Sequence, residues 1–464
     1  MKTAIRCVVL LAVLLALVGG TAGGPFGEQY KISGKDNYGY MGCSVAAVGD
    51  QDGDGYDDFI VGLYGVGLAK VLSGVDGSTI YELKGNGGDD FGWSVAGIPD
   101  FDGDGLPEFI VGTQYSDYVK VFTSSAGKEA YSIKGMNGGE YFGFSVAGID
   151  DLDGDSLGDF AVGALYGYDT SKVQSGHVMV FSGSSGNNIY TVYGVNAGSN
   201  SDEFGCAVAG GADVDGDGYG DFAVGARYGY DSSQGTYPGY AMVFSGQAGK
   251  QIATFYGSTD YGYYGQSVAY AGDVNDDDYP DLVVGAPYDW NTPYGYYGVI
   301  QVISGADGGT IYTLYAGDTG ATDYYLGWSV CGLGDFDGDG YDDFAAGGEY
   351  LVSPEGYWSG GARAWSGYDG SVLFTVHGKS DYVGFGIAIC SLTDTSTGDF
   401  YGFVVGAPYD SSGGSNGGAV HLFKELEITG SVSINGGAPY TTSPDVTLYL
   451  AWTAPASTVK EVRV

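Results

Sequence analysis

The chain has 464 residues, with 57 acidic against 17 basic side chains and a formal net charge of −40. Long-range repulsion at this charge excludes nucleic acid and anionic membrane surfaces as partners. Hydrophobic residues make up 44% of the sequence and aromatic residues 15%, which is too apolar for an acidic disordered chain. We therefore expect a folded protein with a large core.

Residues 1–22 have the pattern of a secretory signal peptide. Lys2 and Arg6 precede an apolar run from Cys7 to Val18, and small residues follow it. The run is too short to span a bilayer comfortably, and no later segment approaches about 18 uninterrupted apolar residues. We predict cleavage near Ala22 and export of a protein that is secreted or held at the cell surface, with no transmembrane segment in this chain.

A nine-residue acidic phrase recurs along the chain and lies inside a longer repeated frame. The frame reads FGCAVAGGADVDGDGYGDFAVGA at 204–226, and the phrase itself begins at Asp50, Asp100, Asp151, Asp213, Asp273 and Asp335. A seventh copy at 385–407 keeps the frame but loses the acids. The repeat unit therefore occurs seven times.

Each unit predicts one antiparallel sheet, because four short β-type runs are separated by glycine-containing turns and show no helical periodicity. Four-stranded units of about 40–60 residues are typical of propeller blades. The sequence thus predicts an all-β, seven-bladed β-propeller over residues 26–425. The last unit lacks a fourth strand, and YKISG at 30–34 matches that strand in other units, so we expect the N-terminal strand to complete the last blade.

The segment 426–464 changes character, since Thr, Ser and Val alternate on both sides of an Asn435-Gly436 turn. This pattern predicts the opening strands of an immunoglobulin-like β-sandwich. We expect the sandwich to be incomplete, because about three strands cannot form a stable sandwich alone. Either the domain continues past Val464 or these strands dock on the propeller.

The cysteines that follow the signal sequence do not indicate a disulfide scaffold. Cys43, Cys206, Cys331 and Cys390 each lie in an apolar strand-like stretch, as small buried side chains do.

Short motifs on both sides of the acidic loop in each unit resemble those of a known family. Phe204-Gly205 with Gly225-Ala226, and GAPYD at 285–289 and 406–410, flank an acidic loop between the first two strands. These residues resemble the FG-GAP repeat of the integrin α-subunit N-terminal β-propeller. The resemblance covers about residues 26–425, which is the propeller module and not a complete integrin. It implies that the face opposite the acidic loops binds partners.

The acidic phrase has the donors of a calcium loop. Positions 1, 3 and 5 of a tight loop can turn their carboxylates inward, position 7 can offer a backbone carbonyl, and position 9 can close the shell. Flexible oxygen donors in this number suit Ca²⁺ better than Mg²⁺. An EF-hand does not fit, because position 12 is an apolar strand residue and no helices flank the loop. A solvated acidic turn without metal is the alternative.

The predicted ligands of six structural Ca²⁺ ions are Asp50, Asp52, Asp54, Tyr56 and Asp58; Asp100, Asp102, Asp104, Leu106 and Glu108; Asp151, Asp153, Asp155, Leu157 and Asp159; Asp213, Asp215, Asp217, Tyr219 and Asp221; Asp273, Asn275, Asp277, Tyr279 and Asp281; Asp335, Asp337, Asp339, Tyr341 and Asp343. Tyr and Leu contribute their carbonyl groups. Without a cation the carboxylates of each loop would repel one another. The seventh loop has no such set and should bind no calcium.

The opposite rim is predicted to be uneven, because the loops between second and third strands are long in units 3 to 7 and short in units 1 and 2. Aromatic residues gather at the tips of the long loops and offer rigid surface for a protein or for sugars. The candidate ligand residues are Trp290, Tyr294, Tyr296, Tyr297, Tyr357 and Trp358. Alternatively, these aromatics pack on neighbouring loops and fill the rim.

The sequence indicates a non-catalytic protein. It has no HExxH, GxSxG, phosphate loop or CxxC cluster, and its three histidines, His177, His377 and His421, lie in predicted strands. We predict an extracellular adhesion or recognition module for a protein or glycan. The alternatives are a lectin-like carbohydrate binder and the non-catalytic propeller of a secreted hydrolase, such as a lipase or a polysaccharide-cleaving enzyme.

Overall fold

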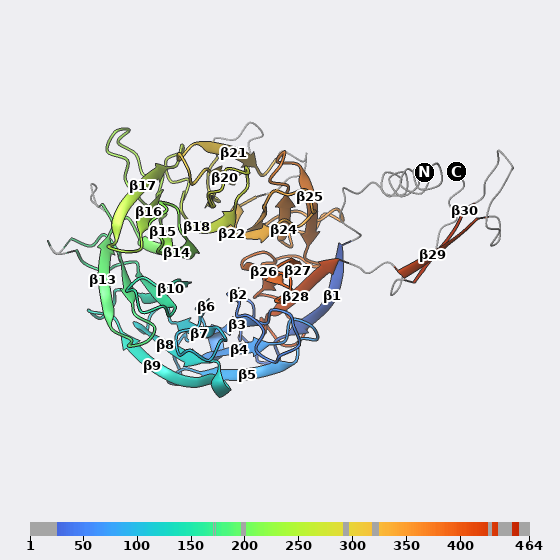
Figure 1. Ribbon diagram of the computed structural model, residues 1–464, viewed down its shortest axis with the longest axis horizontal. Helices are drawn as coiled ribbons and strands as arrows, with labels where there is room; N and C mark the ends of the chain where they lie inside the picture. Colours follow the sequence, from blue (N-terminus) through green and yellow to red (C-terminus); the bar gives the residue numbers. More distant parts are fainter. Residues whose placement is uncertain are drawn as a thin grey trace. The chain divides into compact units, whose positions relative to one another are not determined.

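The computed structural model describes residues 26–169, 171, 173–195, 201–290, 297–317, 324–425, 429–434 and 448–453. In this part of the chain the strands form seven four-stranded sheets and one two-stranded ladder. Figure 1 shows the seven sheets as blades around a central axis, with the first strand of each unit innermost. The predicted seven-bladed β-propeller is confirmed. Residues 29–422 form one compact unit.

The blades follow the sequence order of the units. Blades 1 to 3 consist of β2 (Val45–Ala47), β3 (Phe59–Leu63), β4 (Leu68–Leu72) and β5 (Thr79–Lys84); β6 (Ser94–Ile98), β7 (Glu108–Gly112), β8 (Tyr118–Thr123) and β9 (Lys128–Lys134); β10 (Phe142–Ile149), β11 (Asp159–Ala164), β12 (His177–Phe181) and β13 (Asn188–Tyr193). Blades 4 to 6 consist of β14 (Phe204–Ala212), β15 (Asp221–Ala226), β16 (Tyr240–Ser245) and β17 (Lys250–Tyr256); β18 (Ser267–Gly272), β19 (Asp281–Ala286), β20 (Val299–Ile303) and β21 (Thr310–Tyr315); β22 (Leu326–Gly334), β23 (Asp343–Gly348), β24 (Gly361–Trp365) and β25 (Val372–His377). Two 3₁₀ turns, η1 (Tyr64–Val66) and η2 (Ser125–Gly127), lie in blades 1 and 2.

Blade 7 is assembled from both ends of the propeller. Its strand order is β1-β28-β27-β26, with β1 (Phe26–Ser33), β28 (Ala419–Glu425), β27 (Phe400–Ala407) and β26 (Ile389–Thr393). The Gly34 amide donates to the Gly418 carbonyl at 2.8 Å, and Lys31 Nζ lies 2.8 Å from Asp410 Oδ2. The predicted closure by the N-terminal strand is therefore confirmed, because β1 pairs with the outer edge of β28.

The core lies between neighbouring blades. One cluster joins Ile98 and Ile110 of blade 2 to Phe142, Phe160 and Phe181 of blade 3, and similar clusters join other pairs. The second strand of each unit is fully buried over most of its length, as expected for a strand covered on both faces.

Two glycines per unit explain the FG-GAP punctuation. A Cβ built on Gly225, in the second strand of blade 4, would lie 1.9 Å from the carbonyl oxygen of Gly265, the FG glycine of blade 5. Gly265 has φ 85°, which favours glycine. The same clash recurs at every joint, in the pairs 62 and 92, 112 and 143, 163 and 205, 285 and 327, 347 and 386, and 406 and 42. Neighbouring blades thus approach backbone to backbone at these glycines.

The other predicted segments are described only in part. β29 (Thr429–Ile434) and β30 (Leu448–Thr453) form an antiparallel ladder that pairs Thr429 with Thr453. The turn at Asn435-Gly436 lies outside the described residues, so the immunoglobulin-like identity of 426–464 stays a prediction. The predicted signal peptide, residues 1–22, also lies outside them. No helix among the described residues is long and apolar enough to cross a membrane.

Candidate functional site

The first aspartate of each acidic loop shapes the loop backbone. Asp213 Oδ1 accepts hydrogen bonds from the amides of Gly216 at 2.7 Å and Asp217 at 3.1 Å, and Oδ2 accepts one from Gly218 at 2.9 Å. Equivalent bonds form at Asp50, Asp100, Asp151, Asp273 and Asp335. Six loops therefore share one backbone conformation.

The turn position of the loops has a positive φ that glycine adopts most easily. Gly218 has φ 89°, whereas Ser156 in the third loop and Asp278 in the fifth adopt φ 69° and 70°. A side chain at such a position is strained, although Asp tolerates it better than most residues. These two loops therefore begin with a less favourable backbone.

The acid at position 9 is completely buried and ties the loop to the turn between third and fourth strands. Asp221 Oδ2 accepts from the Val214 amide at 2.7 Å, and Oδ1 accepts from the Gly246 amide at 2.9 Å. Asp58, Asp159, Asp281 and Asp343 make the same two bonds. A large hydrophobic residue follows each of these acids and lies in the core, which fixes their position.

Burial makes these position-9 carboxyls weak acids in the metal-free loop. Desolvation is the largest cause, and repulsion by loop aspartates adds to it. The pKa rises to about 7 for Asp58, Glu108, Asp281 and Asp343, and to about 6 for Asp159 and Asp221. A bound cation would favour the ionised form of each.

Loop 2 departs from this pattern at two positions together. Glu108 Oε2 accepts from the Phe101 amide at 2.8 Å, but its Oε1 is buried and has no hydrogen-bond partner. The glycine that follows the third strand in the other acidic-loop blades is Ser124 here. Ser124 Oγ instead donates to Asp104 Oδ2 at 2.8 Å.

The structure brings carboxylates together in five of the six predicted loops. In each group, one oxygen per residue lies within 4.8 Å of the others: Asp50, Asp52 and Asp58; Asp100, Asp102, Asp104 and Glu108; Asp151, Asp153 and Asp159; Asp213, Asp215 and Asp221; Asp335, Asp337 and Asp339. The fifth loop has the amide Asn275, whose buried Oδ1 has no hydrogen-bond partner.

These donors fit a hard divalent cation. Carboxylate and amide oxygens at one centre are the ligands that Ca²⁺ prefers, and the unpartnered Glu108 Oε1 and Asn275 Oδ1 lie at predicted ligand positions. The carbonyl groups of Tyr56, Leu106, Leu157, Tyr219, Tyr279 and Tyr341 stay predicted ligands, as do Asp54, Asp155, Asp217, Asp273, Asp277, Asp281 and Asp343, which are not grouped with their loop partners.

The sequence analysis did not identify a serine whose hydroxyl donates a hydrogen bond to the aspartate at loop position 5. Ser245 Oγ donates to Asp217 Oδ2 at 3.2 Å, and Ser304 Oγ donates to Asp277 Oδ2 at 3.1 Å. Ser124, Ser184 and Ser366 serve Asp104, Asp155 and Asp339 in the same way. The serine of FSG at 244–246, ISG at 303–305 and WSG at 365–367 is the sequence signal for this role, whereas Ser124 and Ser184 lie one and two residues further along their units.

The seventh loop is a plain turn. Asp394 Oδ1 accepts from the amide and hydroxyl of Ser396, which lowers the pKa of Asp394. The other positions are Ser396, Gly398, Phe400 and Gly402, and they supply no carboxylate.

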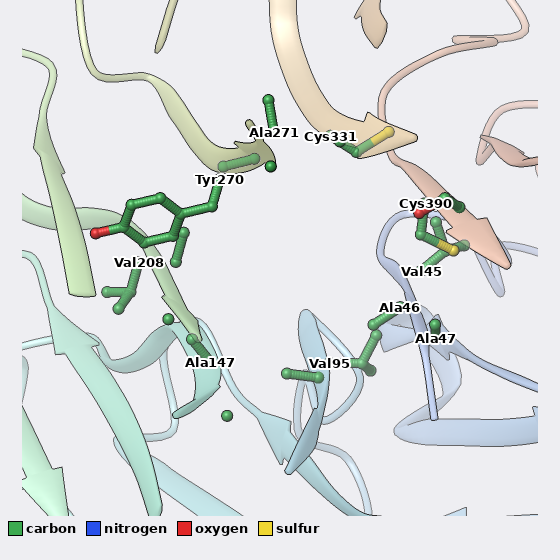
Figure 2. A pocket seen from close by; sticks show the side chains of 18 of the residues that line it. Val45, Ala46, Ala47, Val95, Ala147, Val208, Tyr270, Ala271, Cys331 and Cys390 are labelled. Atoms are coloured by element: carbon green, nitrogen blue, oxygen red, sulfur yellow. The ribbon is translucent and has the colours of Figure 1, made fainter. Parts of the chain in front are cut away.

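The central channel offers little chemistry. A cavity of about 510 Å³ is lined by residues of the inner strands. Figure 2 shows small apolar side chains among them, such as Val45, Val95 and Val208. Cys331 and Cys390 also line the cavity, and burial raises the pKa of both thiols. All four described cysteines are free. Thiols held in the protonated form are poor nucleophiles.

An aromatic ring surrounds the axis at the end of the blades opposite the acidic loops. A tyrosine follows the second strand in every blade: Tyr64, Tyr115, Tyr166, Tyr228, Tyr288, Tyr350 and Tyr409. In four blades the residue before the FG-type pair is a tyrosine that links neighbouring ring tyrosines. Tyr263, for example, has its ring centroid 4.8 Å from Tyr228 and 4.5 Å from Tyr288.

The linking position uses backbone strain to aim its side chain. Tyr40, Tyr141, Glu203, Tyr263 and Tyr325 have φ between 53° and 62°. Such values are costly for residues with a Cβ and cluster at functional sites. Each of these tyrosines contacts a ring tyrosine on both sides, at centroid distances from 4.5 to 6.0 Å.

Comparison with known proteins agrees with this geometry. The model of the FG-GAP repeat matches residues 91–128 and 204–244. Integrin alpha-5 of Xenopus laevis is 32% identical over 218 residues, which cover 45% of this chain and 20% of the relative. Integrin alpha-PS2 of Drosophila melanogaster is 33% identical over 165 residues, covering 32% of this chain and 12% of the relative.

The chain contains FG-GAP repeats and is similar to integrin alpha subunits. The predicted resemblance is thus confirmed. The matches span about a fifth or less of the length of these relatives.

Two charged residues differentiate the aromatic ring of this integrin alpha-like propeller. The Arg227 guanidinium lies 5.6 Å from the Phe144 ring and 5.8 Å from the Tyr228 ring, and it pairs with Glu203 at 2.6 Å. Glu349, on the blade 6 side, forms no ion pair within the described residues. Burial raises the pKa of Glu349. Burial is also the main cause that raises the pKa of Tyr288, Tyr325, Tyr350 and Tyr409, and the charge of Glu349 adds to it in all four.

The predicted rim residues are partly exposed and partly packed. Trp290 is 58% exposed. Trp358 stacks on Tyr324 at 5.4 Å, and Tyr297 lies 6.0 Å from ring residue Tyr325. Tyr294 and Tyr296 lie outside the described residues. Trp358 and Tyr297 thus contact neighbouring aromatics while staying 40% and 38% exposed, and Tyr357 is 42% exposed.

Proposed function

We propose that this chain is the recognition module of an extracellular or cell-surface protein, in which calcium has a structural role and the aromatic face binds a partner. The integrin alpha relatives support an adhesion or recognition role. The signal-like residues 1–22 support export.

The observation that carries the partner-binding role is Glu349 among its four tyrosines. A half-buried carboxylate with no cation of its own is costly, whereas aromatic faces attract cations. The arrangement suits a lysine or arginine of a protein partner, which would neutralise Glu349 and stack on the tyrosines. Exposed Trp290 and the Trp358–Tyr324 stack would add apolar contact beside it.

The partner proposal is tested by screening the protein against immobilised extracellular proteins and a glycan array, in calcium. We expect a protein ligand whose binding weakens about 10-fold or more in Glu349→Gln, because the partner's charge would lose its counter-ion. A triple change of Trp290, Tyr297 and Trp358 to Ala should also weaken it. A folded Asp217→Ala protein should bind as before.

Two outcomes would redirect the proposal. A glycan ligand that survives Glu349→Gln but is lost in the triple variant would favour the lectin-like alternative. Loss of ligand binding only in Asp217→Ala would place recognition on the metal face, which is the side of the propeller that carries the acidic loops.

The calcium part is tested separately by calorimetric titration. We expect six equivalents, one for each of the loops that begin at Asp50, Asp100, Asp151, Asp213, Asp273 and Asp335. Two or fewer would contradict the proposal.

A further inference from the structure

Loop 1 is bonded to the turn of blade 7 on the metal face. Asp57 Oδ2 accepts hydrogen bonds from the Thr393 amide at 2.8 Å and from Thr393 Oγ1 at 2.6 Å, and the Asp57 amide donates to the Thr393 carbonyl at 2.9 Å. The Gly55 carbonyl accepts from the Thr395 amide at 3.0 Å and from Thr395 Oγ1 at 2.9 Å. Five hydrogen bonds thus join residues 55–57 to residues 393–395.

Other joints have fewer bonds of this kind among the described residues. Between blades 2 and 3 the Gly158 amide donates to the Asp100 carbonyl at 2.9 Å. Between blades 5 and 6 Asp342 and Asp273 exchange two bonds. The joint between blades 7 and 1 is therefore the most heavily cross-linked on this face, and it adjoins the blade that is assembled from both ends of the propeller.

The cross-linked residues belong to a candidate calcium loop. The Gly55 amide donates to Asp50 Oδ2 at 2.8 Å, and the Tyr56 amide donates to Asp54 Oδ1 at 3.1 Å. Tyr56 also packs on Tyr401 of blade 7, with ring centroids 4.1 Å apart. Thr393 and Thr395 are therefore hydrogen-bonded to a segment whose backbone is held in place by carboxylates that we expect to bind the cation.

We infer that calcium binding by loop 1 is coupled to closure of the propeller between blades 7 and 1. Loop 1 with its cation presents Gly55 and Asp57 in the conformation that the blade 7 turn recognises. Blade 7 has no acidic loop with a set of carboxylates, and it is held to blade 1 through loop 1. Coupling is reciprocal, so the joint must raise the calcium affinity of loop 1 as much as calcium strengthens the joint. This inference rests on the proposed structural role of calcium.

The first test weakens the blade 7 side of the joint. The variant Thr393→Ala with Thr395→Ala removes the two hydroxyl bonds of the five and keeps every predicted calcium ligand. Titration of calcium against a chelator should show one site weakened about 5-fold or more and the others unchanged. Thr123→Ala, which removes a hydroxyl bonded only within its own blade, is the control and should leave all sites unchanged.

The second test removes the loop side and reads closure by hydrogen exchange. Asp52→Ala should speed amide exchange in β1 and β26, whereas the equivalent Asp153→Ala in loop 3 should leave these strands protected. Unchanged calcium affinities in the threonine variant, or equal exchange in both aspartate variants, would overturn the coupling while leaving calcium binding intact. A wild-type protein that binds no calcium would overturn the proposed function as well.

Discussion

The metal face and the aromatic face are built by the same seven repeats but differ in how regular they are. On the metal face, the side of the acidic loops, the first aspartate accepts a hydrogen bond from the amide at position 6 in all six loops. On the aromatic face the residue before FG is Tyr in four blades and Asp90, Glu203 or Gly384 in the others, and the loops behind it differ in length. A face that holds strands together can repeat one solution, whereas a face that recognises one partner must break the symmetry of the ring.

Removing calcium should break the metal face and produce the largest effect. Each ion that binds only the folded state adds about 2.7 kcal/mol at a concentration 100 times its dissociation constant. Loss of six ions should lower the melting temperature by about 10 °C or more. Scanning calorimetry with and without chelator measures this, and magnesium replacement is the control. A chelated protein that melts as before would show that the loops are solvated acidic turns.

Single substitutions on the two faces should differ in their effect on the melting temperature. Asp215→Ala removes a grouped ligand of loop 4 and should lower the melting temperature in calcium by a few degrees, as the loss of about one ion predicts. Trp290→Ala alters a side chain that is 58% exposed and should shift it by less than about 1 °C. The reverse ranking, in the same calorimetric scan, would contradict the assignment of roles.

Much of the fold could be predicted, because the relevant signals lie close together in the sequence. Seven copies of one frame predict seven blades, and YKISG at 30–34 predicts the closing strand. The six acidic phrases predict the loops for the same reason. Each phrase holds its candidate ligands within nine residues.

Contacts between units were harder to predict. The Gly246 amide bonded to Asp221 lies 25 residues further along the chain, and the partner of Gly225 is a glycine of the next blade. The aromatic ring was missed for this reason, although a tyrosine follows the second strand in all seven units. Glu349 was missed because its significance depends on tyrosines from three blades.

Acidity should distinguish the metal-free loops from the loaded ones. The folded pKa of the position-9 acids is about 6 to 7, above the value of about 4 in an unfolded chain. The folded protein therefore binds these protons more tightly, and its stability falls as pH rises from about 4 towards 7. In chelator, the melting temperature should rise when pH is lowered from 8 to 6. In saturating calcium it should stay level or fall, because protons compete with the ion. Parallel slopes in the two buffers would contradict this.

The smallest effect should come from loop 2, where the metal face departs from its own rule. A Cβ at Gly74, the position equivalent to Ser124, would lie 2.0 Å from the Asp57 carbonyl oxygen, so a serine there cannot sit as close to the loop. We expect the longer side chain of Glu108, relative to Asp, to compensate for the greater distance between Ser124 and the loop. Glu108→Asp alone should then leave a shorter buried acid with fewer partners, and Ser124→Gly alone should lose the bond to Asp104.

The double variant should restore the arrangement of the other blades. We would measure the free energy of unfolding by urea denaturation in calcium. The double variant should be more stable, by about 1 kcal/mol, than the sum of the two single changes predicts. The reverse cycle in blade 4, Asp221→Glu with Gly246→Ser, is the matched control and should show coupling of the same sign, since it rebuilds the loop 2 pair in a blade that lacks it. Additive effects in both cycles would mean that Ser124 and Glu108 differ from the other blades independently, and that the buried Glu108 oxygen is explained by the cation alone.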